Sequence, residues 1–281
     1  MNKPVPRSVL ARRIVLALLA LLLMTTGCAA NQPAGGEREV TVLVYNIRAG
    51  KDMAGVENLP RVAELVRRVG ADLVLLQEVD RNTQRSGPAD QPAVLARLTG
   101  YDVAFGRTIG FQGGDYGIAL LSRWPIRRDT LLPLAVTAPP GQSAEGREQR
   151  GVLSAVIDAP GGPIAVLNTH LDASGDDVWR LQEIAGVLRE ADAARRSGLP
   201  LLVGGDFNSR PESPIHESLR AAGFRDAWAR CGTGDALTFP ANAPNRRIDY
   251  LYLTGDARCT EARVLPDEVS DHRALLVRVR L

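Results

Sequence analysis

Two short strings of this chain combine acidic, amide and imidazole side chains: GDFN at 205–208 and SDH at 270–272. Each adjoins an apolar run typical of a buried strand, 201–203 before the first string and 274–277 after the second. Residues just beyond a strand end are held rigidly yet face solvent. Their oxygens are ligands suited to a divalent cation, and the imidazole can move a proton near neutral pH. This combination suits attack of water on a phosphoester.

Further strand-like runs end in the same kinds of side chain. An isolated Asn or Asp after a strand is usually a turn residue that caps its own backbone. Turn chemistry does not explain six such positions in one chain, because the set also includes Glu and His. We therefore interpret them as one site, with these additional members: Asn46 after 40–45, Glu78 after 72–76, His170 after 163–167, and Asp249 inside 247–253.

The ordered motifs resemble the endonuclease/exonuclease/phosphatase superfamily, which includes deoxyribonucleases, apurinic endonucleases, neutral sphingomyelinases and inositol polyphosphate 5-phosphatases. Periodicity alone indicates only strands alternating with helices. The resemblance implies an α/β fold, a four-layer α/β sandwich of two packed mixed β-sheets flanked by helices, with a Mg²⁺-dependent phosphoesterase site at one edge. It extends over 40–281 through YNIR at 45–48, LQEV at 76–79, NTHL at 168–171, GGDFN at 204–208, RIDY at 247–250 and SDH at 270–272.

The resemblance also implies a metal site and a base. Glu78 is the main expected ligand of Mg²⁺, with Mn²⁺ as a substitute, and Asn46 and Asp271 complete or support its oxygen shell. His272 is the expected general base. Asp249 is expected to fix the tautomer of His272 and raise its basicity.

Four more positions are expected to act on the substrate. Asp206 and Asn208 are two residues apart, so on an extended segment both point to the same side and can hold the attacking water and a phosphate oxygen. His170 is expected to donate to a non-bridging oxygen or to protonate the leaving group. Arg150 matches an arginine that often contacts the substrate phosphate in relatives.

Two positions are expected to lie outside this set. His216, at the start of a predicted helix, is expected to be an ordinary surface residue. Arg48 stands where apurinic endonucleases commonly have an acid, which favours the deoxyribonuclease and sphingomyelinase branches.

The N-terminus has the pattern of an export signal. Four basic residues precede an unbroken apolar run of eleven residues at 14–24, too short to cross a bilayer, which needs roughly twenty residues. The string TTGC at 25–28 resembles a bacterial lipoprotein signal. We therefore expect a signal peptide at 1–27, lipidation of Cys28, a tether at 28–39 and an outward-facing, membrane-anchored domain; simple secretion or an uncleaved anchor are the alternatives.

Removal of 1–27 would change the formal net charge, because this segment holds four of the 34 basic residues and none of the 32 acidic ones. The charge would fall from +2 to −2. A dedicated nucleic-acid-binding protein usually has a clear basic excess. The sequence therefore carries no strong nucleic-acid signature.

Two cysteines remain after Cys28. In an oxidising compartment Cys231 and Cys259 are candidates to pair, and the closed loop would restrict the unfolded chain by roughly 3–4 kcal/mol. No spacing typical of a zinc site accompanies them.

The remaining pattern predicts a single domain at 40–281 that we expect to be monomeric. Apolar spacing predicts helices over 57–69 and 178–195. The glycine-rich segment 108–116 and the proline-containing segment 135–147 are expected to be long loops that shape the substrate site.

Three functions fit these observations. The first is an extracytoplasmic Mg²⁺-dependent phosphoesterase, a phosphodiesterase or phosphatase acting on a phospholipid, an inositol phosphate or a sugar phosphate. The second is a secreted nuclease acting on DNA or RNA. The third is a catalytically silent module that binds a phosphorylated ligand, but a silent relative is expected to lose Glu78, His170 or His272, and all three are present.

The lipoprotein signal is tested by changing one residue. The change Cys28→Ser should release or mislocalise the protein, because lipidation of this cysteine would provide the anchor. Membrane fractionation of cells that express the variant measures the effect. Unchanged fractionation would instead indicate an uncleaved helix.

Overall fold

The computed structural model describes residues 1, 38–141 and 143–281. The predicted signal peptide, Cys28 and most of the predicted tether lie outside the described residues. The first strand, β1 (Glu39–Asn46), begins one residue before the predicted domain boundary. Within the described residues, no helix is both long enough and apolar enough to span a membrane.

Alternation of apolar side chains explains how β1 joins two hydrophobic cores. Val40, Val42 and Val44 pack into a core between two sheets. Leu43 and Tyr45 point to the opposite face and pack into a second core beneath helices. Because successive side chains of a strand point to opposite faces, a strand with apolar side chains on both faces must be covered on both sides.

Two six-stranded mixed sheets follow from this pattern. The order of the first is β11-β12-β1-β2-β4-β3, and that of the second is β5-β6-β7-β8-β10-β9. The first sheet consists of β1, β2 (Leu73–Arg81), β3 (Asp102–Phe111), β4 (Gly114–Ser122), β11 (Arg258–Val264) and β12 (Leu275–Arg280). The second consists of β5 (Ile126–Pro133), β6 (Gly151–Ile157), β7 (Ile164–His170), β8 (Leu201–Asp206), β9 (Arg225–Asp226) and β10 (Asp249–Leu253).

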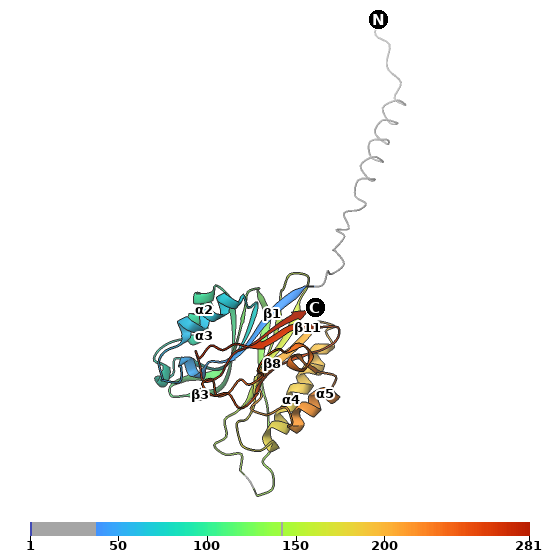
Figure 1. Ribbon diagram of the computed structural model, residues 1–281. Helices are drawn as coiled ribbons and strands as arrows, with labels where there is room; N and C mark the ends of the chain where they lie inside the picture. Colours follow the sequence, from blue (N-terminus) through green and yellow to red (C-terminus); the bar gives the residue numbers. More distant parts are fainter. Residues whose placement is uncertain (2–37, 142) are drawn as a thin grey trace. The chain divides into compact units, whose positions relative to one another are not determined.

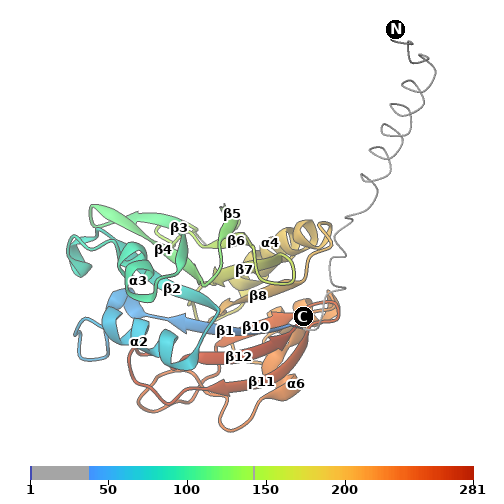
Figure 2. The ribbon, with the colours of Figure 1, turned by 90° about the horizontal axis from the view of Figure 1, so that it is seen from above.

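Helices cover the outer face of each sheet, which gives the four layers expected from the sequence (Figures 1 and 2). Helices α2 (Leu59–Val69) and α3 (Gln91–Thr99) lie outside the first sheet, and α4 (Val178–Arg195) and α5 (Pro214–Ala221) lie outside the second. The predicted α/β sandwich is therefore confirmed. The remaining short helices are η1 (Arg48–Gly50), η2 (Gln84–Ser86) and α6 (Ala227–Cys231).

The two helix predictions hold closely. The helix predicted over 178–195 has the observed bounds of α4, whereas the helix predicted over 57–69 begins two residues later, at Leu59. Asn58 precedes that helix and Pro60 lies in its first turn, where a proline needs no hydrogen-bond partner.

The loop predicted over 108–116 is wrong, because this segment forms the ends of β3 and β4 joined by a two-residue turn. Gln112 and Gly113 occupy the turn with φ of 47° and 81°, the left-handed conformation that favours glycine. Gly114 is the first residue of β4. Glycine is required there, because a Cβ would lie 2.3 Å from the Arg81 carbonyl oxygen. Glycine here marks close approach of neighbouring strands and not only a loop.

The other expected loop and the two cysteines agree with the structure. The described parts of 135–147 contain no helix or strand. A disulfide joins Cys231, at the end of α6, to Cys259 of β11, with 5.8 Å between their Cα atoms. This bond ties the second sheet's last helix to the edge of the first sheet.

Candidate active site

Strand pairing brings the predicted side chains to one end of the sandwich. In the second sheet, β8 lies between parallel β7 and antiparallel β10. The register places both His170 and Asp249 opposite Asp206. In the first sheet, β1 and β2 are parallel, so Asn46 and the residues after Gln77 emerge at the same edge. The backbone alone therefore assembles a row of polar groups.

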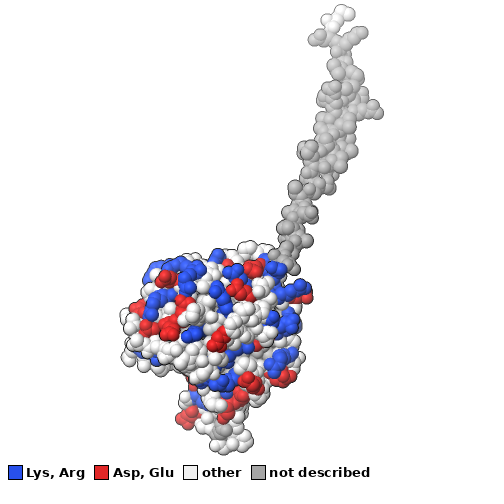
Figure 3. Space-filling view, in the orientation of Figure 1, with Lys and Arg blue, Asp and Glu red and all other residues white. Residues whose placement is uncertain are grey.

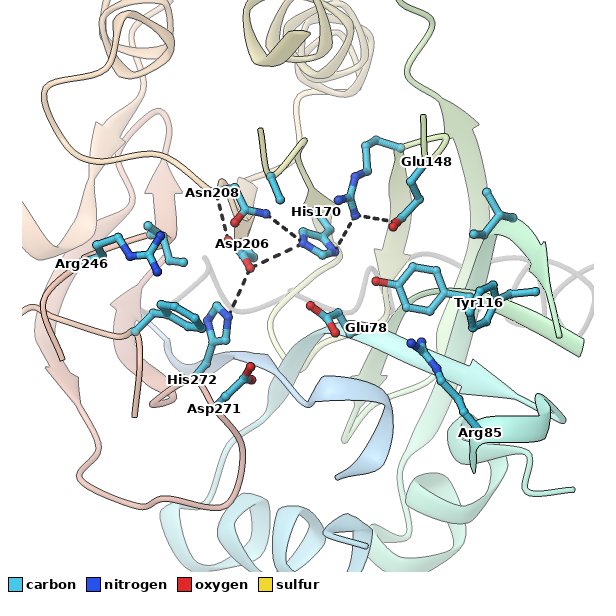
Figure 4. Close-up of a pocket in the computed structure, with 16 residues that line it drawn as sticks. Glu78, Arg85, Tyr116, Glu148, His170, Asp206, Asn208, Arg246, Asp271 and His272 are labelled. Carbon is cyan, nitrogen blue, oxygen red and sulfur yellow. Dashed lines mark hydrogen bonds and ion pairs between the residues drawn. The ribbon is translucent and has the colours of Figure 1, made fainter. Parts of the chain in front are cut away.

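These groups surround a cavity of about 490 Å³ (Figure 4). Seven of the residues predicted from the sequence line it. The other two, Asn46 and Asp249, are buried beside it. The seven are Glu78, Arg150, His170, Asp206, Asn208, Asp271 and His272.

Asp206 lies at the centre of the site. Its Oδ2 atom is 3.6 Å from Nε2 of His170 and 3.6 Å from Nε2 of His272. The same oxygen accepts a hydrogen bond from Nδ2 of Asn46 at 3.1 Å. Burial raises the pKa of the Asp206 carboxyl, and the nearby charge of Asp249 raises it further. Asp206 therefore holds a proton more readily than an exposed carboxylate does.

Asp249 and His272 form a buried pair on one side of Asp206. Nδ1 of His272 donates to Oδ2 of Asp249 at 2.9 Å. Burial opposes the positive charge of His272, but Asp249 and then Asp206 outweigh it, and the pKa of this histidine is raised. The expected orienting role of Asp249 fits this contact. His272 therefore holds a proton more readily than an exposed histidine does, and its role as the base stays a prediction.

His170 lies on the other side of Asp206 and is neutral. Burial, the Arg150 guanidinium and His272 all lower its pKa well below the usual value. Nη1 of Arg150 lies 3.0 Å from Nδ1 of His170, and a guanidinium has only donors, so Nδ1 accepts. The proton of the neutral ring is therefore on Nε2, which faces Asp206 and Asn208.

Arg150 lines the cavity and also contacts neighbouring side chains, and its contact with a substrate phosphate stays a prediction. Besides the contact with His170, its Nη1 atom lies 2.6 Å from Oε1 of Glu148. The side chain is buried and its charge is balanced by this glutamate. In this structure Arg150 orients His170.

Glu78 is held in an unusual backbone conformation. It has a φ of 53°, at an irregularity where the pairing of β2 with β4 shifts register between Leu76 and Val79. Such bulges re-aim a side chain, and a left-handed non-glycine residue persists only where its surroundings enforce it. Here the bulge directs the Glu78 carboxylate into the cavity (Figure 4).

Asn46 supports the carboxylates of Glu78 and Asp206. Its Nδ2 atom donates to Oε1 of Glu78 at 3.0 Å and to Oδ2 of Asp206 at 3.1 Å. Only the nitrogen end of the amide can face two carboxylate oxygens. The amide oxygen accepts from the backbone nitrogen of Arg48 at 3.0 Å. These contacts fit the supporting role expected of Asn46, and direct binding of a metal ion by Asn46 stays a prediction.

Two groups of side chains are suited to a metal ion. Glu78 and Asp271 present carboxylates to the cavity, and hard oxygen ligands fit a divalent cation such as Mg²⁺. Arg48 lies 3.5 Å from Asp271, so a cation there would compete with this ion pair. Ligand atoms of Asp206, Asp249 and His272 also lie within 4.8 Å of one another. In that second group, however, Asp249 and His272 already bind each other.

Asn208 reaches the site by a different geometry from the expected one. It lies beyond β8 with a φ of 49°, not on an extended segment. Its backbone nitrogen donates to Oδ1 of Asp206, and its Nδ2 atom donates to the Leu171 carbonyl oxygen at 3.0 Å. The same Nδ2 atom lies 3.0 Å from Nε2 of His170. The N–H groups on Nδ2 of Asn208 and Nε2 of His170 therefore lie next to each other at the cavity.

The expectation that His216 is a surface residue is wrong. Its side chain is 1% exposed. Nε2 lies 2.8 Å from Oγ of Ser209, and Nδ1 lies 2.7 Å from the hydroxyl of Tyr252. Ile215 and Leu219 mark the buried face of α5, and His216 belongs to it. The spacing of Ile215 and Leu219 in the sequence is the signal that could have predicted burial of His216.

About half of the cavity wall consists of side chains that no sequence motif marks. Ile109, Phe111 and Tyr116 lie in 108–116, which was expected to shape the substrate site, although as a loop, and the others were not predicted. Their aromatic and arginine side chains stack in pairs, as Arg85 does on Phe111 at 4.8 Å. The missed residues include Arg85, Ile109, Phe111, Tyr116, Glu148, Phe239, Arg246 and Ile248.

The site thus combines a buried acid between two imidazoles with carboxylates suited to a cation, on a four-layer fold. The chain matches the model of the Endonuclease/Exonuclease/phosphatase family over residues 43–272. It therefore belongs to this family, whose members are hydrolases acting on phosphoesters, such as phosphatases and phospholipase C.

Two curated proteins have sequences similar to this chain. The chain is 30% identical over 236 residues to the uncharacterized protein YbhP of Escherichia coli K12, covering 79% of this chain and 88% of YbhP. It is 28% identical over 182 residues to an inositol phosphosphingolipids phospholipase C of Schizosaccharomyces pombe. That match covers 61% of this chain and 41% of the phospholipase.

Solved structures share the fold. A member of the family from Beutenbergia cavernae is 27% identical and superposes with a TM-score of 0.74, covering 87% of this chain and 72% of that one. The mannosyl-6-phosphatase Bt3783 of Bacteroides thetaiotaomicron is 20% identical with a TM-score of 0.72, covering 85% and 99% of the two chains. At this lower identity the likeness shows the fold alone.

Burial of His216 predicts an acid-sensitive contribution to stability. Burial lowers its pKa to about 4, below the 6.5 of an unfolded histidine. The unfolded chain then binds more protons between these values, so this contribution is complete above pH 6.5 and is lost as the pH falls towards 4. The change His216→Gln should lower the free energy of unfolding at pH 7 by about 1–3 kcal/mol and flatten its slope below pH 6.5.

Denaturant unfolding at several pH values measures both effects. The exposed Glu217, the next residue of α5, supplies the control variant Glu217→Gln. Equal stability and an unchanged pH slope in His216→Gln would contradict the buried role.

Proposed function

We propose that this chain is an extracytoplasmic, Mg²⁺-dependent phosphoesterase that hydrolyses its substrate by direct attack of water. The observation that carries the proposal is the position of Asp206, whose Oδ2 atom is 3.6 Å from an imidazole nitrogen on each side. One of these rings, His170, is neutral, and the other, His272, favours its charged form. Acid–base chemistry and charge stabilisation are thus available within one cavity.

Glu78 and Asp271 would hold the cation. Bound there, Mg²⁺ supplies positive charge that polarises the phosphoryl oxygen and stabilises the negative charge of the transition state. Asn46 fixes the Glu78 carboxylate from behind through its 3.0 Å hydrogen bond. Because both expected ligands are carboxylates, a hard cation is favoured over zinc.

Asp206 is better suited than His272 to accept the proton of the attacking water. Its pKa is raised towards neutrality, and a carboxylate with a raised pKa is a stronger base than an exposed one. His272 keeps its own proton because Asp249 and Asp206 favour the imidazolium. In this arrangement Asp206 takes the proton from water, the water oxygen bonds to phosphorus, and the phosphorus–oxygen bond to the leaving group breaks on the opposite side. The leaving alkoxide then takes a proton from solvent to become the alcohol.

His170 and Asn208 supply donors for the phosphate. Arg150 leaves the proton of His170 on Nε2, and Nδ2 of Asn208 lies 3.0 Å from that atom. Two neighbouring N–H donors cannot form a hydrogen bond with each other, but both can donate to one non-bridging oxygen of a phosphate. Such donors stabilise charge that grows in the transition state.

A small polar phosphoester is the favoured substrate: a phospholipid head group, an inositol phosphate or a sugar phosphate. The relation to an inositol phosphosphingolipids phospholipase C supports this class. Basic and acidic side chains are interspersed over the face seen in Figure 3, without the single-sign stripe of a dedicated nucleic-acid-binding surface. A secreted nuclease is the second candidate, favoured by the arginines that line the cavity.

Metal dependence and the ranking of the residues test the proposal. EDTA should abolish hydrolysis of bis-p-nitrophenyl phosphate by residues 29–281, and Mg²⁺ or Mn²⁺ should restore it. The change Glu78→Gln should raise the Mg²⁺ concentration needed for half-maximal rate, so added metal partly rescues it. His272→Ala should lower kcat by about a hundredfold or more without metal rescue, and Asp249→Asn should cost less.

The same assay on duplex DNA, sphingomyelin and inositol phosphates separates the two substrate classes. Arg258→Gln, a change on the exposed edge strand β11, is the matched control. Full activity in EDTA, or restoration by Zn²⁺ alone, would contradict the assigned metal site. If His272→Ala had a lower melting temperature but a normal kcat, the pair of Asp249 and His272 would be structural and not catalytic.

A further inference from the structure

The catalytic cavity continues into a second hollow of about 430 Å³. Four residues line both spaces: Ala173, Asn208, Arg246 and Ile248. In Figure 4, Arg246 lies on the opposite side of His170 and Asp206 from Tyr116 and Arg85. A substrate whose phosphate reaches Asp206 can therefore extend past Arg246 into the second hollow.

The arginines of the catalytic cavity differ in how their charges are balanced. Arg85 binds both carboxylate oxygens of Asp80 at 2.8 Å, and Arg150 lies 2.6 Å from Glu148. Arg246 has no acidic partner among the residues that the structure describes. It stacks on the ring of Phe239, with its guanidinium carbon 4.5 Å from the ring centre. Arg246 is thus a positioned cation whose charge is not neutralised.

A second such arginine lines the adjoining hollow. Nη1 of Arg210 donates to the backbone oxygen of Asn245, the residue before Arg246, at 3.0 Å. Within the described part of the chain, Arg210 also lacks an acidic partner. Arg210 is thus held by the backbone next to Arg246, and both guanidinium groups line the same hollow.

The acids of the hollow do not cancel this charge. Asp177 is paired with Arg180 at 2.8 Å. Glu212 is exposed and forms no ion pair with the described residues. The lining therefore carries three arginines against two acids, an excess of one positive charge. The hydroxyl group of Ser213 adds a neutral hydrogen-bond donor, whereas that of Ser174 already donates to Asp172.

We propose that this second hollow binds a further phosphate of the same substrate, so that the preferred substrate is a small organic phosphoester carrying two phosphates. The inference rests on the proposed phosphoesterase function, since it places the scissile phosphate at Asp206. Guanidinium groups bind phosphate oxygens through charged, often paired hydrogen bonds. The stacking on Phe239 and the bond to Asn245 hold both groups before the substrate arrives, which lowers the entropic cost of binding.

The test compares substrates that differ only in the second phosphate. The p-nitrophenyl ester of thymidine 5′-phosphate is assayed with and without a 3′-phosphate, and inositol 1-phosphate is compared with inositol 1,4-bisphosphate by phosphate release. The ratio of kcat/KM between the members of each pair should be about tenfold in favour of the second phosphate. Whichever pair shows the larger ratio identifies a nucleotide or a polyol as the carrier.

Variants then assign the effect to the hollow. Arg246→Gln and Arg210→Gln should each reduce that ratio by about fivefold or more, since each removes one of two charges. Both residues are exposed, so the fold should be retained, which thermal melting checks. Arg258→Gln should leave the ratio unchanged.

Two outcomes would overturn the inference. They are a ratio near one for both pairs, and a ratio that neither arginine variant changes while the substrates are hydrolysed. Absence of hydrolysis of any phosphoester with any metal would instead overturn the proposed function. In that case, calorimetric titration with thymidine 3′,5′-bisphosphate against thymidine 5′-phosphate still tests the hollow, and equal affinities in the parent and in Arg246→Gln would exclude it.

Discussion

The site depends on one buried carboxylate, Asp206, that faces two imidazoles and an amide. A buried charge is costly unless it is paired or hydrogen-bonded, and here Asn46, His170 and His272 provide the partners. The same burial that makes the charge costly shifts its pKa towards neutrality. Structural cost and chemical reactivity therefore have one origin, and the neighbouring side chains keep the carboxylate in place.

The two-sheet architecture makes this arrangement possible. Asp206 and His170 come from the second sheet, whereas Asn46 and Glu78 come from the first. The hydrogen bonds from Asn46 to Asp206 and to Glu78 thus join the sheets at the site. Close packing of the apolar core between them fixes this distance, because core side chains interdigitate and resist sliding.

Much of the fold and of the site follows from the sequence because the reactive residues lie at or near strand ends. An apolar run followed by a polar group is a local signal, and parallel strands then bring such groups to one edge. Glu78, His170 and Asp206 were predictable for this reason. Their environment was not: the left-handed φ of Glu78 and the contact of Arg150 with His170 arise from packing between distant segments.

The failures have the same physical cause. In segment 108–116, Gly114 lies against neighbouring backbone and Gly113 occupies a tight turn, and a count of glycines does not distinguish these roles from a flexible loop. His216 is buried by its helix packing on the second sheet. Arg246 gains its importance from a stack on Phe239 and from the hollow beside it, both of which depend on tertiary structure.

The central claim, that Asp206 accepts the proton of the attacking water, is tested most directly by the change Asp206→Asn. The amide keeps the size of the side chain but cannot take a proton at neutral pH. With saturating Mg²⁺, kcat should fall by about a thousandfold or more while the melting temperature stays close to that of the parent. A stable variant whose kcat remains within about tenfold of the parent would contradict the account.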